Sequence, residues 1–331
     1  MEERDVVIIG AGPAGLSAAI FTQFDGWSTL VLESSWSGGQ GAIAYTVSNY
    51  PGFPPGDGAV LMENMEKQVT SAPPSGIGAE LRMERVIGLK VDDKVVITEK
   101  NEYRAQAIVL ASGSRMQKLG APGEESFFGK GVSYYARRDV EQFTGKRVLV
   151  VGGGNSTAKS ALLARTVASQ VILIHRRESL RAYPTMTKRL QKGGIEVWFN
   201  TELKEIRGGD HVEGAVVANN KTGKEIEVGV DHIIICVGTE PDTRLAQDAG
   251  LEMKENFVKI DDRMMTSKQG IFACGEITGA DRHLISCTAS GASAGMSASE
   301  YLALEMVRNG KMFEGAINAK YSDEYLAMSH L

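Results

Sequence analysis

A glycine pattern near the N-terminus constrains the fold more than any other feature: GAGPAG at residues 10–15, directly after the apolar run VVII. In a strand-turn-helix unit of this kind, Gly10 permits the tight turn, Gly12 lets the backbone approach a pyrophosphate, and Gly15 lets the helix pack closely on the strand. The start of that helix offers free N–H groups and a partial positive charge to phosphates. The candidate dinucleotide contacts here are Gly10, Gly12, Pro13, Ala14 and Gly15.

A single G-x-G-x-x-G pattern is weak evidence, but its surroundings strengthen it. The segment TLVLE follows as a second apolar strand and ends in Glu33. Dinucleotide-binding folds place an acid at about this spacing, where it accepts hydrogen bonds from ribose hydroxyls. We therefore expect a Rossmann-like domain to begin here, with Glu33 among its nucleotide contacts.

A second copy of the pattern lies in the middle of the chain, where the apolar strand KRVLVV leads into GGGNST at residues 152–157. Gly152 and Gly154 take the first two glycine roles, and Thr157 occupies the third. Because Thr is bulkier than Gly, we expect slightly looser packing of helix on strand. The candidate contacts of this second loop are Gly152, Gly154, Asn155, Ser156 and Thr157.

The strand after this second loop ends in a basic cluster. The segment QVILIHRRESLR carries no acid at the position that would bind a ribose diol. Arginines there favour NADPH over NADH, because they bind a 2′-phosphate through charge-assisted, often bidentate, hydrogen bonds. A solvated basic surface is the alternative interpretation. The candidate 2′-phosphate residues are His175, Arg176, Arg177 and Arg181.

A third motif, GIFACGEITG at residues 270–279, indicates a flavin. Glu276, after Gly275, is placed to accept hydrogen bonds from ribityl hydroxyls. A helix from about Leu284 would aim its positive end at the flavin edge where negative charge accumulates.

Two short segments, LASG and CVG, end in Gly113 and Gly238 and mark where the chain passes between domains. The sequence thus predicts an α/β fold of two Rossmann-like domains, each with a three-layer ββα arrangement. The NADPH domain is inserted into the FAD domain. We expect the FAD domain at 1–118 and 246–331, and the NADPH domain at 119–245.

Composition excludes several classes of protein. The chain has 331 residues, a formal charge of −5 and no long basic run, which argues against nucleic-acid binding. The first apolar run is too short for a signal peptide or membrane span, so we expect a cytoplasmic protein with no membrane partner. The three cysteines, Cys236, Cys274 and Cys287, form no C-x-x-C pair, and no metal site is expected. Cys287 alone is a candidate for thiol reactivity.

The order of motifs resembles the low-molecular-weight thioredoxin reductase family, class II of the pyridine nucleotide-disulfide oxidoreductases. The motifs are GAGPAG, GGQ, NYPG, LASG, GVSYYARRD, GGGNS, HRRESLR, ACGE and RHLISCTASG. The resemblance implies a homodimer with FAD and NADPH as cofactors. It also implies a domain rotation that presents the flavin alternately to NADPH and to a redox disulfide. By position, it implies further flavin contacts at Gly39, Gln40, Asn49, Arg282, His283 and Leu284. His283 departs from the family's Gln.

The larger departure lies in the segment that the family uses for its disulfide. Where relatives have Cys-x-x-Cys followed by Asp, this chain has Tyr135, Ala136, Arg137 and Arg138, then Asp139. Only a thiolate performs thiol–disulfide exchange, so neither Tyr135 nor Arg138 can replace the lost cysteines. No catalytic side chain is assigned, because the flavin itself would carry the redox chemistry.

We therefore expect an FAD-dependent NADPH oxidoreductase that passes electrons to an external acceptor: ferredoxin or flavodoxin, a quinone, or oxygen. Ferredoxin–NADP reductases of the thioredoxin-reductase-like type are the nearest analogy. The Arg137–Arg138 pair would either attract an acidic carrier or form an ordinary solvated helix start neutralised by Glu141. Tyr321, Tyr325 or His330 would either stack on the flavin or belong to an ordinary capping helix with a frayed end. Two alternatives stay open: a disulfide reductase with relocated or partner cysteines, and a flavoprotein sensor that does not turn over.

Overall fold

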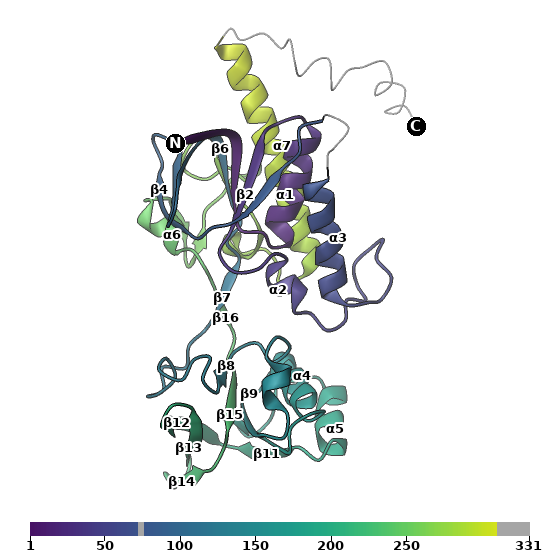
Figure 1. The fold of residues 1–331 in the computed structure, drawn as a ribbon, viewed down its shortest axis with the longest axis vertical. Helices are drawn as coiled ribbons and strands as arrows, with labels where there is room; N and C mark the ends of the chain where they lie inside the picture. Colours follow the sequence, from purple (N-terminus) through teal and green to yellow (C-terminus); the bar gives the residue numbers. More distant parts are fainter. Residues whose placement is uncertain (72–75, 310–331) are drawn as a thin grey trace. The chain divides into compact units, whose positions relative to one another are not determined.

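The structure is a computed structural model that describes residues 1–71 and 76–309. The chain forms two compact units (Figure 1). Unit 1 comprises Met1–Ser114 and the chain from Pro241 onward, and unit 2 comprises Arg115–Glu240.

Unit 1 is built on a seven-stranded mixed sheet in the order β3-β2-β1-β6-β5-β4, with β19 also paired to β6. Its strands are β1 (Glu2–Ile9), β2 (Thr29–Glu33), β3 (Glu80–Met83), β4 (Val86–Lys90), β5 (Val95–Thr98), β6 (Glu102–Leu110) and β19 (Ile271–Ala273). Its helices are α1 (Pro13–Phe24), α2 (Gly39–Ala42), α3 (Gly58–Thr70), α6 (Arg244–Asp248), η2 (Gly275–Thr278) and α7 (Leu284–Arg308). The hairpin β17 (Met253–Lys254) and β18 (Phe257–Val258) completes the unit.

Alternation along β1 separates two cores. Val6 and Ile8 face one core with α1, α3 and α7, which lie side by side in Figure 1. Val7 and Ile9 face the other core, toward α6 and β18. Each strand of a sheet that is covered on both faces must be apolar on both sides, which is why VVII reads as a continuous run.

Two glycines of α7 allow it to pack directly on α1. A Cβ at Gly291 would lie 2.0 Å from the Ala14 carbonyl oxygen, and one at Gly295 would lie 2.6 Å from that of Ala18. The two helices therefore touch backbone to backbone, and this contact fixes the start of α1 against the C-terminal part of the chain.

Unit 2 has a parallel five-stranded sheet in the order β11-β10-β9-β15-β8 and an antiparallel sheet β12-β13-β14. Its strands are β8 (Val132–Ser133), β9 (Arg147–Gly152), β10 (Gln170–His175), β11 (Glu196–Phe199), β12 (Thr201–Gly208), β13 (Val212–Asn219), β14 (Glu225–Val228) and β15 (His232–Cys236). Its helices are η1 (Val140–Phe143), α4 (Asn155–Ala164) and α5 (Pro184–Lys192).

The three layers of unit 2 are visible in its two cores. Val148 and Val150 of β9 pack with α4 and α5, whereas Leu149 and Val151 pack toward β12 and β13. Helices thus cover one face of the parallel sheet and the three-stranded sheet covers the other. The ββα arrangement predicted from the sequence is confirmed.

The chain crosses between the units at Ser114–Arg115 and returns at Glu240–Pro241, where the sequence predicted crossings after residues 118 and 245. Both crossings lie in a short pair of strands, β7 (Ser114–Met116) and β16 (Thr239–Pro241). Gly113 and Gly238 precede or lie beside these strands, with φ of 68° and 119°. Among the described helices, none is long and apolar enough to cross a membrane.

Unit 2 should lose stability in acid because of His232. Burial lowers the pKa of this histidine to about 4, Asp139 opposes that change, and its Nε2 has no hydrogen-bond partner among the described residues. Between pH 6.5 and 4 the unfolded chain binds a proton that the folded chain does not, so stability falls as pH falls. We expect a loss of about 1–3 kcal/mol across that window, measured by thermal melting.

His232→Phe should flatten this pH dependence, since Phe can pack against Phe143, whose ring lies 4.7 Å away at an edge-on angle. His211→Phe, at an exposed position of the same unit, is the control and should leave the pH dependence in place. An unchanged profile in the His232 variant would contradict the assignment.

Candidate functional site

The first glycine loop joins β1 to α1, and its glycines have different tasks. A Cβ at Gly10 (φ 108°) would lie 2.3 Å from the Ala111 carbonyl oxygen, and one at Gly15 would lie 1.8 Å from that of Gly10. Both positions therefore need glycine for packing. A Cβ at Gly12 would meet nothing within 4 Å, so the backbone there faces open space. Gly12 caps α1, whose first residues, Pro13 and Ala14, present their end of the helix to that space.

Glu33 stands at the end of β2, beside this loop. Its Oε2 accepts a hydrogen bond of 2.9 Å from the Ala11 N–H, and its Oε1 accepts bonds from the N–H groups of Ser34 and Ser35 at 2.8 and 2.9 Å. The carboxylate is therefore held in place by backbone donors. The sequence pattern gave no signal for the contact with Ala11.

The GGQ segment folds back onto the first loop. The Gly38 N–H donates to the Ala11 carbonyl at 2.7 Å, and a Cβ at Gly39 would lie 3.3 Å from the Gly12 Cα. The indole N–H of Trp36 donates to the Gly39 carbonyl at 3.3 Å, a role that the sequence did not predict. Gln40 Nε2 donates to the Ser114 carbonyl at a long 3.5 Å. Gly39 therefore lines the open space beside Gly12.

Asn49 behaves differently from Gly39. It is exposed in the loop between α2 and α3, and no hydrogen bond described for this part of the chain ties its side chain to the glycine loop. The flavin contact implied by resemblance thus remains a prediction for Asn49.

The third motif lies against the first. Gly275 (φ 75°) would place a Cβ 2.9 Å from the Ala14 Cβ, and its N–H donates to the Ser290 hydroxyl on α7 at 2.9 Å. Ser290 was not predicted, because a serine within a helix carries no distinctive pattern. The short helix η2 then carries Glu276 toward a pocket of about 220 Å³, lined by Pro241, Phe257, Glu276, Gly279, Ala280, Asp281 and Arg282.

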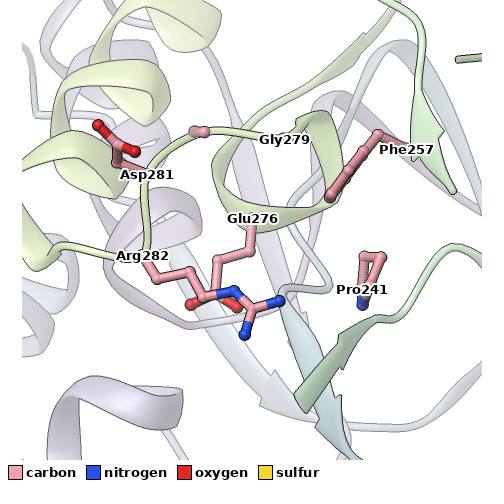
Figure 2. A pocket seen from close by; sticks show the side chains of 7 residues that line it. Pro241, Phe257, Glu276, Gly279, Asp281 and Arg282 are labelled. Carbon is pink, nitrogen blue, oxygen red and sulfur yellow. The ribbon is translucent and has the colours of Figure 1, made fainter. Parts of the chain in front are cut away.

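Glu276 is the unusual group of this pocket. Its Oε2 is buried and has no hydrogen-bond partner within the described residues. Figure 2 shows the Glu276 and Arg282 side chains extending into the same space, whereas Asp281 points away. A buried acceptor without a donor is costly, so the site suits a ligand that donates hydroxyl groups. The ribityl chain of FAD has such donors, and the residues therefore fit this cofactor.

The start of α7 completes this side of unit 1. His283 is the exposed residue before the helix, and its carbonyl accepts from the Cys287 N–H at 3.0 Å. A Cβ at Gly41 would lie 3.0 Å from a methyl carbon of Leu284, so Leu284 packs against α2. The motif RHL is thereby brought near the GGQ segment.

In unit 2, the second glycine loop joins β9 to α4. A Cβ at Gly152 would lie 2.3 Å from the Cys236 carbonyl oxygen, whereas one at Gly154 would meet nothing within 4 Å. The Thr157 hydroxyl donates to the Cys236 carbonyl at 3.2 Å and accepts from the Gly154 N–H at 3.3 Å. The bulkier residue thus joins helix to strand through hydrogen bonds. Asn155 and the exposed Ser156 form the first turn of α4.

His175 lies directly beneath this loop. It is 5% exposed, and a Cβ at Gly153 would lie 2.2 Å from its ring. Burial lowers its pKa, and the positive charges of Arg181, Arg177 and Arg176 lower it further. The imidazole is therefore neutral near pH 7, and its buried Nε2 has no partner in the described part of the chain.

The basic cluster around His175 carries the whole positive excess of unit 2. Residues 176–194 contain six arginines and lysines and one acid, Glu178, which pairs with Lys221. The rest of unit 2 is balanced, with thirteen basic and thirteen acidic residues. Three exposed arginines beside an open glycine loop suit a phosphorylated nucleotide such as NADPH. Gly238 stands apart from this cluster, near the Gln117 side chain.

The segment that replaces the family's cysteines is held by Asp139. Its Oδ2 accepts from the Ser133 hydroxyl at 2.5 Å, and its Oδ1 accepts from Arg138 Nε at 3.2 Å. The Arg138 guanidinium lies 5.3 Å from the centre of the Tyr135 ring, a cation–π distance. Burial raises the pKa of the Tyr135 hydroxyl. The segment therefore offers a half-exposed cation stacked on a phenol.

The three cysteines are free and have weakly acidic thiols. Burial raises the pKa of Cys236 to about 11, and burial together with the charge of Glu276 raises that of Cys287 to about 11. Burial raises the pKa of Cys274 further. Cys236 is only partly buried, because it ends β15 at the loop edge of the sheet.

Two expectations are limited by the extent of the described residues. Tyr321, Tyr325 and His330 lie outside them. Over residues 1–71 and 76–309, no group of three or more His, Cys, Asp or Glu side chains could hold a metal ion.

Comparison with known proteins identifies the family of the chain. The profile of the pyridine nucleotide-disulphide oxidoreductase family matches residues 4–300. Thioredoxin reductase from Treponema pallidum is 37% identical over 305 residues, covering 91% of this chain and 97% of that protein. The crystal structure of Lactococcus lactis thioredoxin reductase is 34% identical with a TM-score of 0.80, covering 91% of this chain and 99% of that one.

A ferredoxin-flavin thioredoxin reductase from Clostridium acetobutylicum is 27% identical with a TM-score of 0.50, covering 92% of this chain and 99% of that one. Thioredoxin reductases use FAD and NADPH, which accords with the open glycine loops and with Glu276. The chain is therefore a thioredoxin reductase-like oxidoreductase and belongs to the pyridine nucleotide-disulphide oxidoreductase family.

Proposed function

We propose that this protein oxidises NADPH through FAD and passes the electrons to an external acceptor without a redox disulfide of its own. The observation that carries the proposal is the segment Tyr135–Arg138, where a stacked phenol and guanidinium occupy the family's cysteine positions. No atom of these side chains can form a mixed disulfide, so electrons cannot leave by that route.

The remaining cysteines support the same conclusion. A thiolate is the reactive form, and a pKa near 11 for Cys236 and Cys287 leaves little thiolate at pH 7. Cys274 and Cys287 are 13 positions apart and Cys236 is farther away, so no pair stands in C-x-x-C spacing. These facts weigh against the alternative of a disulfide reductase with relocated thiols.

FAD would be held by unit 1. When bound, it supplies the redox chemistry, accepting a hydride from NADPH and releasing electrons to the acceptor. The open backbone at Gly12 would receive its pyrophosphate at the N-terminus of α1, Glu33 would bind ribose hydroxyls, and Glu276 would bind the ribityl chain. The other proposed contacts are Gly10, Pro13, Ala14, Gly15, Gly39, Gln40, Asn49, Gly113, Gly275, Arg282, His283 and Leu284.

NADPH would be held by unit 2. The open backbone at Gly154 and the start of α4 would receive the pyrophosphate, and the arginines at 176, 177 and 181 would bind the 2′-phosphate. A neutral His175 beneath the loop leaves these cations as the main charges near the phosphate. The other proposed contacts are Gly152, Asn155, Ser156, Thr157 and Gly238.

For the acceptor, we propose an acidic electron-carrier protein such as ferredoxin or flavodoxin. Arg138 is about half exposed, and its position at the former disulfide puts a cation where the family passes electrons outward. Ferredoxin appears in the name of one of the similar structures. A quinone and oxygen are the other acceptors that the test below distinguishes.

We also propose a homodimer in the cytoplasm. Thioredoxin reductases are typically homodimers. Three apolar residues of α7, Met296, Leu304 and Val307, are exposed in the single chain and are suited to cover a second copy.

The proposal is tested by anaerobic titration of the yellow holoprotein with NADPH. We expect the flavin absorbance to bleach, ferredoxin or flavodoxin to restore it, and oxidised thioredoxin to leave it bleached. Cys287→Ala and Cys236→Ala should turn over within about twofold of the parent, because neither thiol takes part. Rapid thioredoxin reduction, or loss of turnover in either variant, would contradict the proposal, and a flavin that stays oxidised would favour the sensor alternative.

Arg176→Gln and Arg181→Gln should lower kcat/KM for NADPH by roughly ten- to hundredfold each, since each removes a hydrogen bond to a charged phosphate. With NADH, which lacks the 2′-phosphate, the change should stay within about twofold. Lys221→Gln is the control, as it neutralises a cation of the same unit that is already paired with Glu178. Equal losses of kcat/KM with both nucleotides would contradict the 2′-phosphate assignment.

Arg138→Glu should lower kcat/KM for an acidic carrier at low salt by about tenfold or more, and the difference should shrink as salt screens the charges. Arg165→Glu, an exposed substitution on the far end of α4, serves as the control. A salt-independent loss would point to a structural defect around Asp139 instead of reduced attraction.

A further inference from the structure

An aromatic side chain beside the proposed NADPH site is accounted for by none of the motifs. Tyr183 comes directly before α5, and 66% of it is exposed. Among the exposed aromatic side chains of the described residues it is the most open, ahead of Phe128 at 50%. The residue was not singled out by the sequence, because a tyrosine between two motifs has no pattern of its own.

The backbone of Tyr183 is fixed from both sides. Its N–H donates to the Asn155 side-chain oxygen at 2.8 Å, and its carbonyl accepts from the N–H groups of Met186 and Thr187 at 2.8 and 3.1 Å. Asn155 is the first residue of α4, so one of these bonds ties Tyr183 to the start of the phosphate-binding helix. The ring therefore projects from an anchored point and not from a free loop.

The two residues before Tyr183 are attached to the glycine loop itself. The N–H groups of Arg181 and Ala182 both donate to the Gly153 carbonyl, at 2.7 and 3.1 Å. Ala182 is 8% exposed and packs into the helix-side core, whereas Arg181 and Tyr183 on either side of it are exposed. A cation and an aromatic ring thus flank one buried residue at the edge of the open loop.

This pairing matches the chemistry of one end of NADPH. The 2′-phosphate and the adenine are attached to the same ribose, so a side chain next to the phosphate ligand is within reach of the base. Aromatic rings stack on purines irrespective of hydrogen-bonding pattern, and a ring held by its backbone loses little further freedom on binding.

We propose that Tyr183 stacks on the adenine of NADPH while Arg181 binds the 2′-phosphate of the same nucleotide. Tyr183 is then a positioning residue for cofactor binding: it contacts no reacting atom and fixes the adenosine end against unit 2. The inference rests on the NADPH site proposed above for that unit.

The test is calorimetric titration of the FAD-loaded protein with adenosine 2′,5′-bisphosphate, which carries the adenine, the 2′-phosphate and one 5′-phosphate but no nicotinamide. Tyr183→Ala should weaken binding by about tenfold, the effect usual for loss of one stacked base, while Tyr183→Phe keeps the ring and should bind like the parent. Titration with inorganic pyrophosphate, which has no base, should not distinguish Tyr183→Ala from the parent.

Arg181→Gln separates failure of this inference from failure of the NADPH site. If Arg181→Gln weakens the bisphosphate and Tyr183→Ala does not, the stacking role is overturned and the NADPH site stands. If neither variant changes the affinity, both assignments are wrong. Loss of binding in Tyr183→Phe as well as Tyr183→Ala would assign the contact to the hydroxyl and also overturn stacking.

Discussion

Backbone-to-backbone contact at the first glycine loop is the constraint on which unit 1 depends. Gly15 sets α1 against the carbonyl of Gly10, and Gly291 sets α7 against the carbonyl of Ala14. Any side chain at these positions would force the helices apart. Because β1, α1 and α7 meet without intervening side chains, Ala14 and Gly275 come together, although 261 positions separate them in the sequence.

In unit 2, hydrogen bonds instead of backbone contact hold the glycine loop against its helix. Its loop has Thr157 where unit 1 has Gly15, and the threonine hydroxyl bridges the Gly154 N–H and the Cys236 carbonyl. A glycine would allow closer packing of the helix, but the two hydrogen bonds of this buried hydroxyl to backbone groups compensate for that loss. Both units nevertheless leave one glycine, Gly12 or Gly154, facing open space at the start of a helix. The two loops therefore have similar shapes, but backbone contact holds the loop of unit 1 and hydrogen bonds hold that of unit 2.

Much of the fold followed from sequence because strand and glycine patterns are local. The βα loops, the ββα layers and the three arginines that follow His175 all derive from short motifs whose spacing the backbone fixes. What escaped prediction depends on contacts distant in sequence: Ala11 with Glu33, Ser290 with Gly275, and Asn155 with Tyr183. The chain crosses between the units a few residues before the predicted positions. The reason is that the pairing of β7 with β16, not composition, determines where one unit ends.

The placement of charge in unit 2 has a kinetic consequence. All of its positive excess is concentrated in residues 176–194, which include the face of α5 with Lys188, Arg189 and Lys192. A multiply charged anion approaching in solution meets an attractive field at a range set by the Debye length, roughly 8 Å in physiological salt. Under the NADPH assignment proposed above, the summed charge of this segment sets how often the nucleotide arrives, at a rate that falls with ionic strength, whereas the arginines nearest His175 set how long it stays. Capture and retention are thus set by different parts of one basic segment.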